Sequence, residues 1–127
     1  MKKGIIYARH LGTRDYEKSV EEQVEECKKY ALENYIEIVD CYSDYLFNKK
    51  INPNSFDLLS QKLKKLDVDY VIVYNTCILG RDTTKIRKFI NKIYENNKQF
   101  VDITSKDTII GNLQNLVRQC VINTEIR

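Results

Sequence analysis

The sequence lacks the features that mark several classes of protein. No apolar run approaches the roughly 20 residues that a membrane-spanning helix needs, and the apolar stretch near the N-terminus is too short for a secretion signal because Arg9 interrupts it. No internal repeat and no low-complexity segment occurs along the chain. We therefore expect a cytoplasmic protein that does not associate with membranes.

Metal-binding side chains are scarce. His10 is the only histidine, and the cysteines are widely spaced, with no C-x-x-C pair. The cysteines are Cys27, Cys41, Cys77 and Cys120. Structural zinc sites draw several such ligands from closely spaced pairs. The sequence therefore predicts no metal and no cofactor, and it favours free, mostly buried thiols in a reducing compartment.

The composition is that of an ordinary folded domain. The chain has 127 residues, of which 43% are hydrophobic and 31% are charged. A chain of this length buries roughly two thirds of its unfolded surface as one domain. The net charge of +3 is uneven, because residues 81–127 carry nine basic and five acidic side chains. This basic C-terminal third is compatible with a nearby phosphate backbone, and equally with solvated basic helices.

The segment 69–82 is the centre of the predicted fold. Residues 71–73 are apolar and β-branched with polar residues on both sides, which is typical of a strand buried on both faces. One glycine, Gly80, then precedes Arg81 and a helical pattern. Sites in open parallel sheets form where strands end and helices begin. We therefore look for chemistry around residues 75–81 and at the matching end of the first strand.

Strands and helices are expected to alternate along the chain. Besides the central strand, strands are expected over residues 4–8, 35–42 and 99–103, and a loop over 43–54. Helices are expected after Ser19, which forms a capping box with Glu22, after Pro53, after Asp82, and from about Thr108 onward. This order predicts a three-layer α/β/α fold with a mostly parallel sheet of four to five strands. A long C-terminal helix follows, and a second copy of the chain is the simplest partner for its apolar stripe.

Five short motifs occur in a fixed order along the chain. They are Tyr7-Ala8-Arg9, Ser19-Val20-Glu21-Glu22-Gln23, Asn52-Pro53-Asn54-Ser55-Phe56, Leu79-Gly80-Arg81-Asp82 and Phe100-Val101-Asp102-Ile103. In order and spacing this series resembles the N-terminal catalytic domain of the serine recombinases, the resolvase/invertase family. The resemblance implies one resolvase-like catalytic domain over residues 1–127. Residues 108–127 would begin the dimerising arm helix, with no C-terminal DNA-binding domain in this chain.

The resemblance also implies a chemistry, from which this sequence departs. In the family, a serine two residues after the first arginine attacks a DNA phosphodiester, and several arginines stabilise charge on the phosphate oxygens. Here Leu11 occupies the position of that serine, and Asn52 stands where the family has an arginine before proline. Cys77-Ile78 replaces the family's Ser/Asp-Arg pair, so that Arg9 and Arg81 alone remain at arginine positions.

These residues support one leading hypothesis and two alternatives. The first is a serine-recombinase-like domain associated with DNA recombination and impaired in catalysis. The sequence does not decide whether the chain is an enzyme. Arg9 and Arg81 hold the catalytic positions, and both are candidates for binding DNA phosphate together with Lys85 and Lys88. The second is an active recombinase that uses a substitute nucleophile such as Thr13 or another group, and the third is a non-catalytic α/β dimerisation or interaction module. The expected partners are DNA and a second copy of the chain. The two copies are expected to dimerise through residues 108–127.

Overall fold

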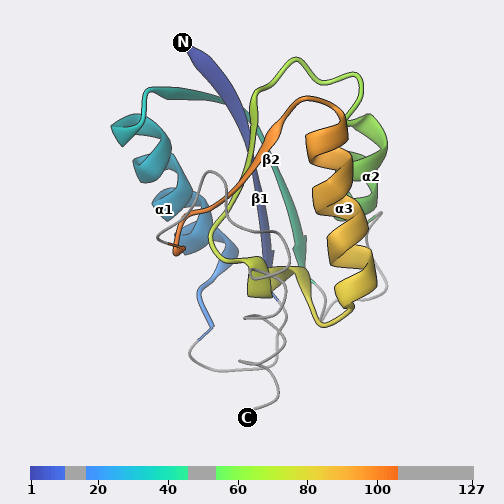
Figure 1. The fold of residues 1–127 in the computed structure, drawn as a ribbon. Coiled ribbons are helices and arrows are strands. Elements are labelled where there is room, and N and C mark those ends of the chain that lie inside the picture. The colour runs from blue at the N-terminus through green and yellow to red at the C-terminus, as the bar shows by residue number, and fades with distance from the viewer. Residues whose placement is uncertain (11–16, 46–53, 106–127) are drawn as a thin grey trace.

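The computed structural model describes residues 1–10, 17–45 and 54–105 and shows one parallel sheet with helices on both faces (Figure 1). The strands are β1 (Lys2–His10), β2 (Ile36–Tyr45), β3 (Tyr70–Val73) and β4 (Gln99–Asp102). The helices are α1 (Val20–Glu33), α2 (Ser55–Lys62), the 3-10 helix η1 (Thr76–Leu79) and α3 (Thr83–Glu95). The strand order is β2-β1-β3-β4, and all neighbouring strands are parallel. The predicted α/β fold is thereby confirmed.

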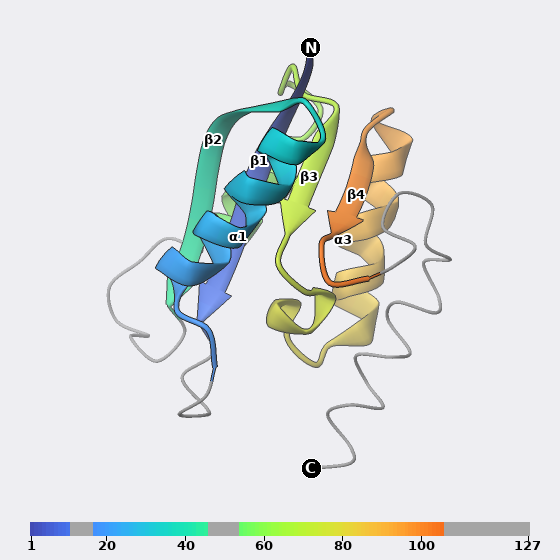
Figure 2. The same cartoon turned by 90° about the vertical axis from the view of Figure 1, so that its left-hand side faces the viewer.

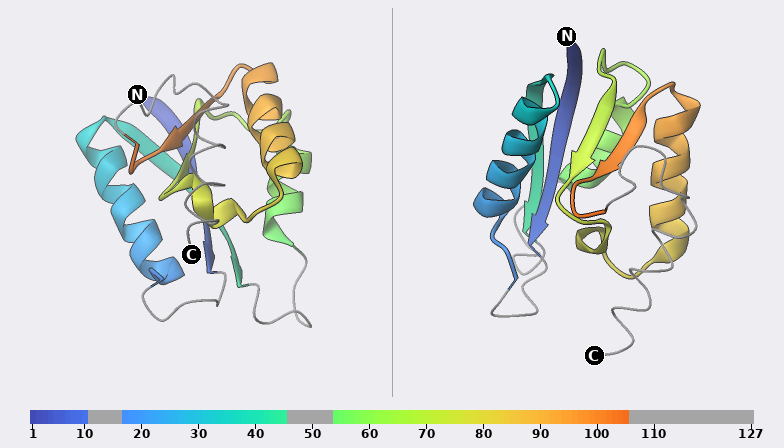
Figure 3. Two further views of the ribbon diagram at one scale, coloured as in Figure 1. Left: turned by 60° about the horizontal axis from the view of Figure 1, so that its bottom comes forward. Right: turned by 60° about the vertical axis from the view of Figure 1, so that its left-hand side comes forward.

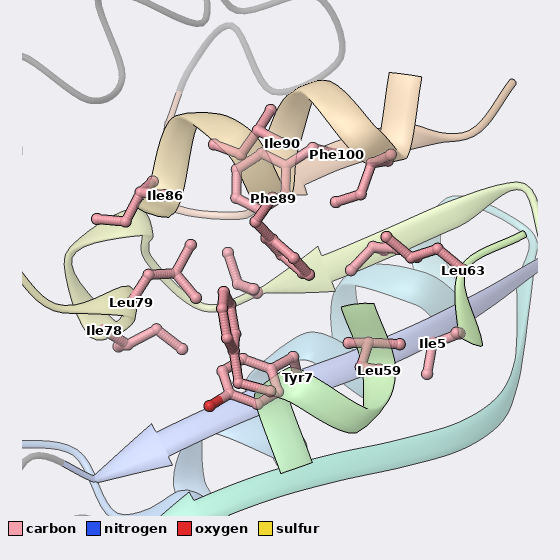
Figure 4. Packing of buried hydrophobic residues seen from close by; sticks show 14 of the residues in the cluster. Ile5, Tyr7, Leu59, Leu63, Ile78, Leu79, Ile86, Phe89, Ile90 and Phe100 are labelled. Atoms are coloured by element: carbon pink, nitrogen blue, oxygen red, sulfur yellow. The ribbon is translucent and has the colours of Figure 1, made fainter. Parts of the chain in front are cut away.

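The sheet is the middle of three layers. Helix α1 covers one face, and α2 and α3 cover the other (Figures 1 and 2). Successive side chains of a strand point to opposite faces. Ile5 and Tyr7 of β1 therefore belong to the core under α2 and α3, and Ile6 belongs to the core under α1. Figure 4 shows the larger of these cores, with Tyr7 inside it. Burial on both faces explains why the central strands have continuous apolar sequences.

Local capping signals fix where the helices begin. The Ser19 side chain accepts a hydrogen bond from the backbone of Glu22, whose side chain accepts one in return, so the predicted capping box is confirmed. Asp82 caps α3 as predicted, accepting from the backbone N–H of Lys85 at 3.0 Å. The predicted apolar stripe of α3 is also confirmed, because its members are all buried. They are Ile86, Phe89, Ile90 and Ile93.

The predicted boundaries need three corrections. Strand β1 is longer than residues 4–8, and β2 continues to Tyr45, so the loop predicted over 43–54 is wrong for 43–45. The polar triplet 43–45 stays in the sheet because the carboxylate of Asp44 is buried with hydrogen-bond partners. Helix α2 ends at Lys62, although its predicted stripe extends to Leu66. The expected C-terminal helix lies outside the described residues. Among those that are described, no helix is long and apolar enough to span a membrane.

Candidate functional site

The carboxyl ends of the parallel strands form one rim of the molecule. In the left view of Figure 3 this rim comes forward, with η1 between the end of β3 and the start of α3. Arg9 lies near the end of β1 and is paired in register with Asp44 of β2. The rim therefore brings together residues from the first strand, the second strand and the segment that follows the third, as parallel sheets do.

Arg9 is buried in this rim, with only 6% of its surface exposed. Its Nε donates to the Tyr7 hydroxyl at 2.8 Å, and its Nη1 donates to the Leu79 carbonyl at 2.9 Å. Its Cζ lies 4.9 Å from the centroid of the Phe56 ring. The Gln23 side chain holds the Arg9 backbone by accepting from its N–H at 3.1 Å and donating to its carbonyl at 2.8 Å. The guanidinium thus connects β1 to η1 and to α2.

A hydrogen-bonded chain connects Arg9 to the start of α2. The Tyr7 hydroxyl donates to Asp44 Oδ2 at 2.6 Å, and Asp44 also accepts from the backbone N–H groups of Ser55 at 2.7 Å and Phe56 at 2.9 Å. Burial, reinforced by Asp44 and opposed by Arg9, raises the pKa of Tyr7 well above its ordinary value. The phenol is therefore neutral and acts as a donor. The Asp44 carboxylate is linked to Arg9 through the Tyr7 hydroxyl and lies at the positive end of a helix.

Gly80 allows the chain to turn from Leu79 to Arg81. Its φ of 100° and ψ of −161° lie in a region that only glycine adopts readily, so the predicted role of this glycine in the turn is confirmed. A Cβ placed on it would lie 3.6 Å from Arg9 Nη1. Arg81 follows immediately and is exposed. The buried Arg9 guanidinium and the backbone leading to Arg81 are therefore neighbours.

The opposite side of η1 is held by Asp102 at the end of β4. Its Oδ2 accepts from the Thr76 N–H at 2.8 Å and from the Thr76 hydroxyl at 2.6 Å. Its Oδ1 accepts from the N–H and hydroxyl of Thr104, at 2.9 and 2.8 Å. Asn75 caps η1 by accepting from the Cys77 N–H at 2.7 Å. These contacts fix the path of the chain before Arg81.

The basic start of α3 reaches the same site. Lys85 Nζ lies 5.4 Å from the Phe56 ring centroid, the ring that Arg9 also contacts, and 3.6 Å from Asp57 Oδ1. Lys88 is exposed about one turn further along α3. The structure therefore brings Lys85 to the surroundings of Arg9, and it places Lys88 at the edge of this region.

The remaining positions that the sequence singled out are those where the family has reactive residues. Leu11 and Thr13 lie outside the described residues, as does Asn52. Ile78, which stands where the family has an arginine, is buried in the core under α2 and α3. Cys77 beside it is half-buried. The site at this position is thus lined by apolar packing rather than by a second guanidinium.

The thiols match the sequence prediction only in part. Of the three cysteines in the described residues, only Cys27 is buried; Cys77 is half-buried and Cys41 is exposed. Burial raises the pKa of the Cys27 thiol to about 12, so it is a neutral core group. Within residues 1–10, 17–45 and 54–105, no group of three or more His, Cys, Asp or Glu side chains could hold a metal ion.

Sequence reasoning assigned no site role to three residues that shape the site: Gln23 and Asp102, which it placed only within motifs, and Asp44. The missed signal for Gln23 was its place on the apolar face of the first helix, between Val20 and Val24. The two aspartates each lie near the carboxyl end of a strand. A carboxylate buried there requires hydrogen-bond partners at the shared rim. Their actual partners could not be read from the sequence.

Comparisons with known proteins cover nearly the whole chain. The family model described as "Resolvase, N terminal domain" matches residues 4–121. Among solved structures, the N-terminal catalytic domain of TP901-1 integrase is 21% identical with a TM-score of 0.72, and the match covers 98% of this chain and 95% of that one. A resolvase family site-specific recombinase from Streptococcus pneumoniae is 20% identical with a TM-score of 0.70, over 99% and 87% of the two chains.

A third similar structure is the C-terminal catalytic domain of ISC1926 TnpA, an IS607-like serine recombinase. It is 15% identical with a TM-score of 0.65, over 98% of this chain and 78% of that one. At such low identities these likenesses establish the fold. No curated protein matches the chain.

Proposed function

The chain belongs to the resolvase family of serine recombinases, whose N-terminal domain model matches residues 4–121, and we propose that it binds the phosphate backbone of DNA without efficient strand cleavage. The proposed contacts are Arg9, Arg81, Lys85 and Lys88. In this proposal, residues 1–127 form one resolvase-like domain. It keeps the DNA-facing rim of the family and lacks the nucleophilic serine and further arginines.

The observation that carries the DNA-binding proposal is the contact between Arg9 Nη1 and the Leu79 carbonyl, 2.9 Å long. It sets the Arg9 guanidinium of β1 beside the turn from which Arg81 emerges. Planar guanidinium groups suit the oxygens of a phosphate diester, and exposed lysines add sequence-independent attraction to a duplex. Lys85 supports the same proposal because its ammonium contacts the ring that Arg9 contacts.

Impaired catalysis is supported by the residues at the family's reactive positions. Leu11 has no hydroxyl, so it cannot form a phosphoserine-type bond. Ile78 is buried in the apolar core and supplies no charge to a phosphate. Losing one donor that stabilises the transition state typically costs about 10²–10³ in rate. Without a nucleophile, the family reaction has no covalent step. The alternative is an active enzyme in which Thr13 replaces the serine.

A covalent-trapping experiment tests the proposed loss of catalysis. The full chain is incubated with nicked duplex substrates that trap protein–DNA intermediates, and adducts are sought by denaturing electrophoresis and intact mass measurement. We expect no adduct. An adduct that disappears in Thr13→Val would overturn the proposal and establish the alternative nucleophile.

Duplex binding is tested through Arg81 because this arginine is exposed, whereas Arg9 is part of the buried structure. We expect Arg81→Ala to weaken binding about tenfold and to reduce the slope of log K against log salt by about one. Arg87→Ala is the matched control, since Arg87 is also exposed but lies two residues from Lys85, on another side of the helix. Equal effects of the two variants would remove Arg81 from the site. Absence of any duplex binding would leave only a non-catalytic α/β interaction module.

A further inference from the structure

One cation of the proposed phosphate site, the Lys85 ammonium, already forms an ion pair with a carboxylate of the chain. Asp57 Oδ1 lies 3.6 Å from Lys85 Nζ, and the two side chains are 54% and 51% exposed. Asp57 directly follows Phe56, whose ring lies 4.9 Å from the Arg9 guanidinium carbon. The ion pair is therefore at the edge of the arginine site and open to solvent.

Two carboxylates near Arg9 and Lys85, those of Asp44 and Asp57, differ in how firmly they are held. Asp44 is buried and accepts from the Tyr7 hydroxyl and from two backbone N–H groups at the start of α2, so it is part of the fold. Asp57, in the first turn of the same helix, is bound to Lys85 only by an exposed ion pair. Exposed pairs of this kind are weak and screened by salt. The Asp57 carboxylate can therefore be displaced without opening the core.

We propose that Asp57 competes with DNA phosphate for Lys85. When no duplex is bound, the Asp57 carboxylate holds the Lys85 ammonium, and a backbone phosphate replaces it when the duplex docks on the rim. The flexible lysine side chain permits this exchange of partners, and the dense charge of duplex DNA favours it most strongly at low salt. The inference rests on the proposed binding of DNA phosphate and adds a residue that lowers the affinity of that same site.

The alternative role for this pair is mechanical. Asp57 belongs to α2 and Lys85 to α3, so their contact could serve only to brace the two helices against each other. A brace stabilises the fold and leaves duplex affinity unchanged apart from the general effect of net charge. The two roles therefore predict different outcomes when the carboxylate is replaced by an amide of the same shape.

The chain offers a matched control for removing one negative charge. Asp67 Oδ2 lies 3.6 Å from Lys3 Nζ, the same separation as in the Asp57–Lys85 pair. Lys3 belongs to the start of β1, and Asp67 precedes β3, so this pair lies at the amino ends of the strands, away from the rim. Asp67→Asn thus changes the net charge as Asp57→Asn does, at the opposite end of the sheet.

Duplex affinity of the full chain, measured by fluorescence anisotropy with a short labelled duplex from low to moderate salt, tests the inference. We expect Asp57→Asn to bind about 3- to 10-fold more tightly than Asp67→Asn at low salt, with the difference shrinking as salt rises. In a Lys85→Gln background the same substitution should change affinity by less than about twofold, because its effect runs through Lys85.

Three results would overturn the inference. The first is an equal duplex affinity of Asp57→Asn and Asp67→Asn. The proposed function would survive that result if the wild-type chain still bound the duplex through Arg81. A lower melting temperature of Asp57→Asn with unchanged affinity would establish the brace instead. If the wild-type chain bound no duplex at all, the proposed function and this inference would fail together.

Discussion

Arg9 shows at the level of a single residue how a proposed phosphate-binding cation can also be structural. A buried charge is costly unless it is paired and hydrogen-bonded. Arg9 donates to the Leu79 carbonyl and to the Tyr7 hydroxyl, which in turn donates to the Asp44 carboxylate. A phosphate that binds Arg9 must therefore accept from guanidinium N–H groups other than those bonded to Tyr7 and Leu79. Substitutions of Arg9 are expected to lower stability as well as binding.

We expect Arg9→Met to lower the free energy of unfolding by about 3 kcal/mol, because it leaves the buried Leu79 carbonyl and the Tyr7 hydroxyl oxygen without their donor. Urea denaturation of the purified chain measures this change. Arg81→Met is the control, and as an exposed substitution it should change stability by less than about 0.5 kcal/mol. Equal stabilities of wild type and Arg9→Met would show that the network contributes nothing.

At the level of the element, η1 is the feature that sets the geometry of the rim. It is short, and its position is fixed from two sides, by Asp102 through Thr76 and by Arg9 through Leu79. Gly80 then ends it with a backbone conformation that other residues avoid. The exposed Arg81 therefore emerges from a segment whose path is determined by contacts with β1 and β4.

Gly80→Ala should lower the free energy of unfolding by about 1–3 kcal/mol, as expected for a residue forced into a glycine-only backbone region. The cause is the backbone, since the added Cβ would lie 3.6 Å from Arg9 Nη1, an ordinary contact distance. Thermal and urea unfolding measure the loss. Gly80→Asn should be no better tolerated, because the conformation is not the left-handed helical one that asparagine accepts. Rescue by asparagine would contradict this explanation.

At the scale of the whole molecule, the described residues form three layers around one sheet. The sequence from residue 108 onward carries a regular apolar stripe, formed by Ile109, Leu113, Leu116, Val117, Cys120 and Val121. An amphipathic helix needs a partner for such a stripe. Residues 108–127 as a dimerising arm therefore stay a prediction, to be tested in solution.

We expect the full chain to sediment as a dimer and Leu116→Glu to shift it to the monomer, since a charge in an apolar interface is poorly tolerated. Sedimentation equilibrium of both proteins measures the change. Asn115→Glu introduces the same charge one position away, on the side of the expected helix opposite the apolar stripe, and should leave the dimer intact. A monomeric wild type would remove the proposed arm.

The sequence by itself determined the order of strands and helices and most helix starts. Capping residues such as Ser19 and Asp82, and the β-branched run at 71–73, act through nearby backbone groups and through periodic burial. Such signals are local, so they can be recognised before the fold is known. The family resemblance likewise depended on short motifs in sequence order.

Only the tertiary structure decided which side chains complete the rim. Tyr7 meets Asp44 across 37 positions, Arg9 meets Leu79 across 70, and Thr76 meets Asp102 across 26. A carboxylate in a sequence shows no partner, because its hydrogen bonds depend on strands that become neighbours only when the sheet forms. The burial of Arg9, and the Asp57 carboxylate beside Lys85, follow from that packing.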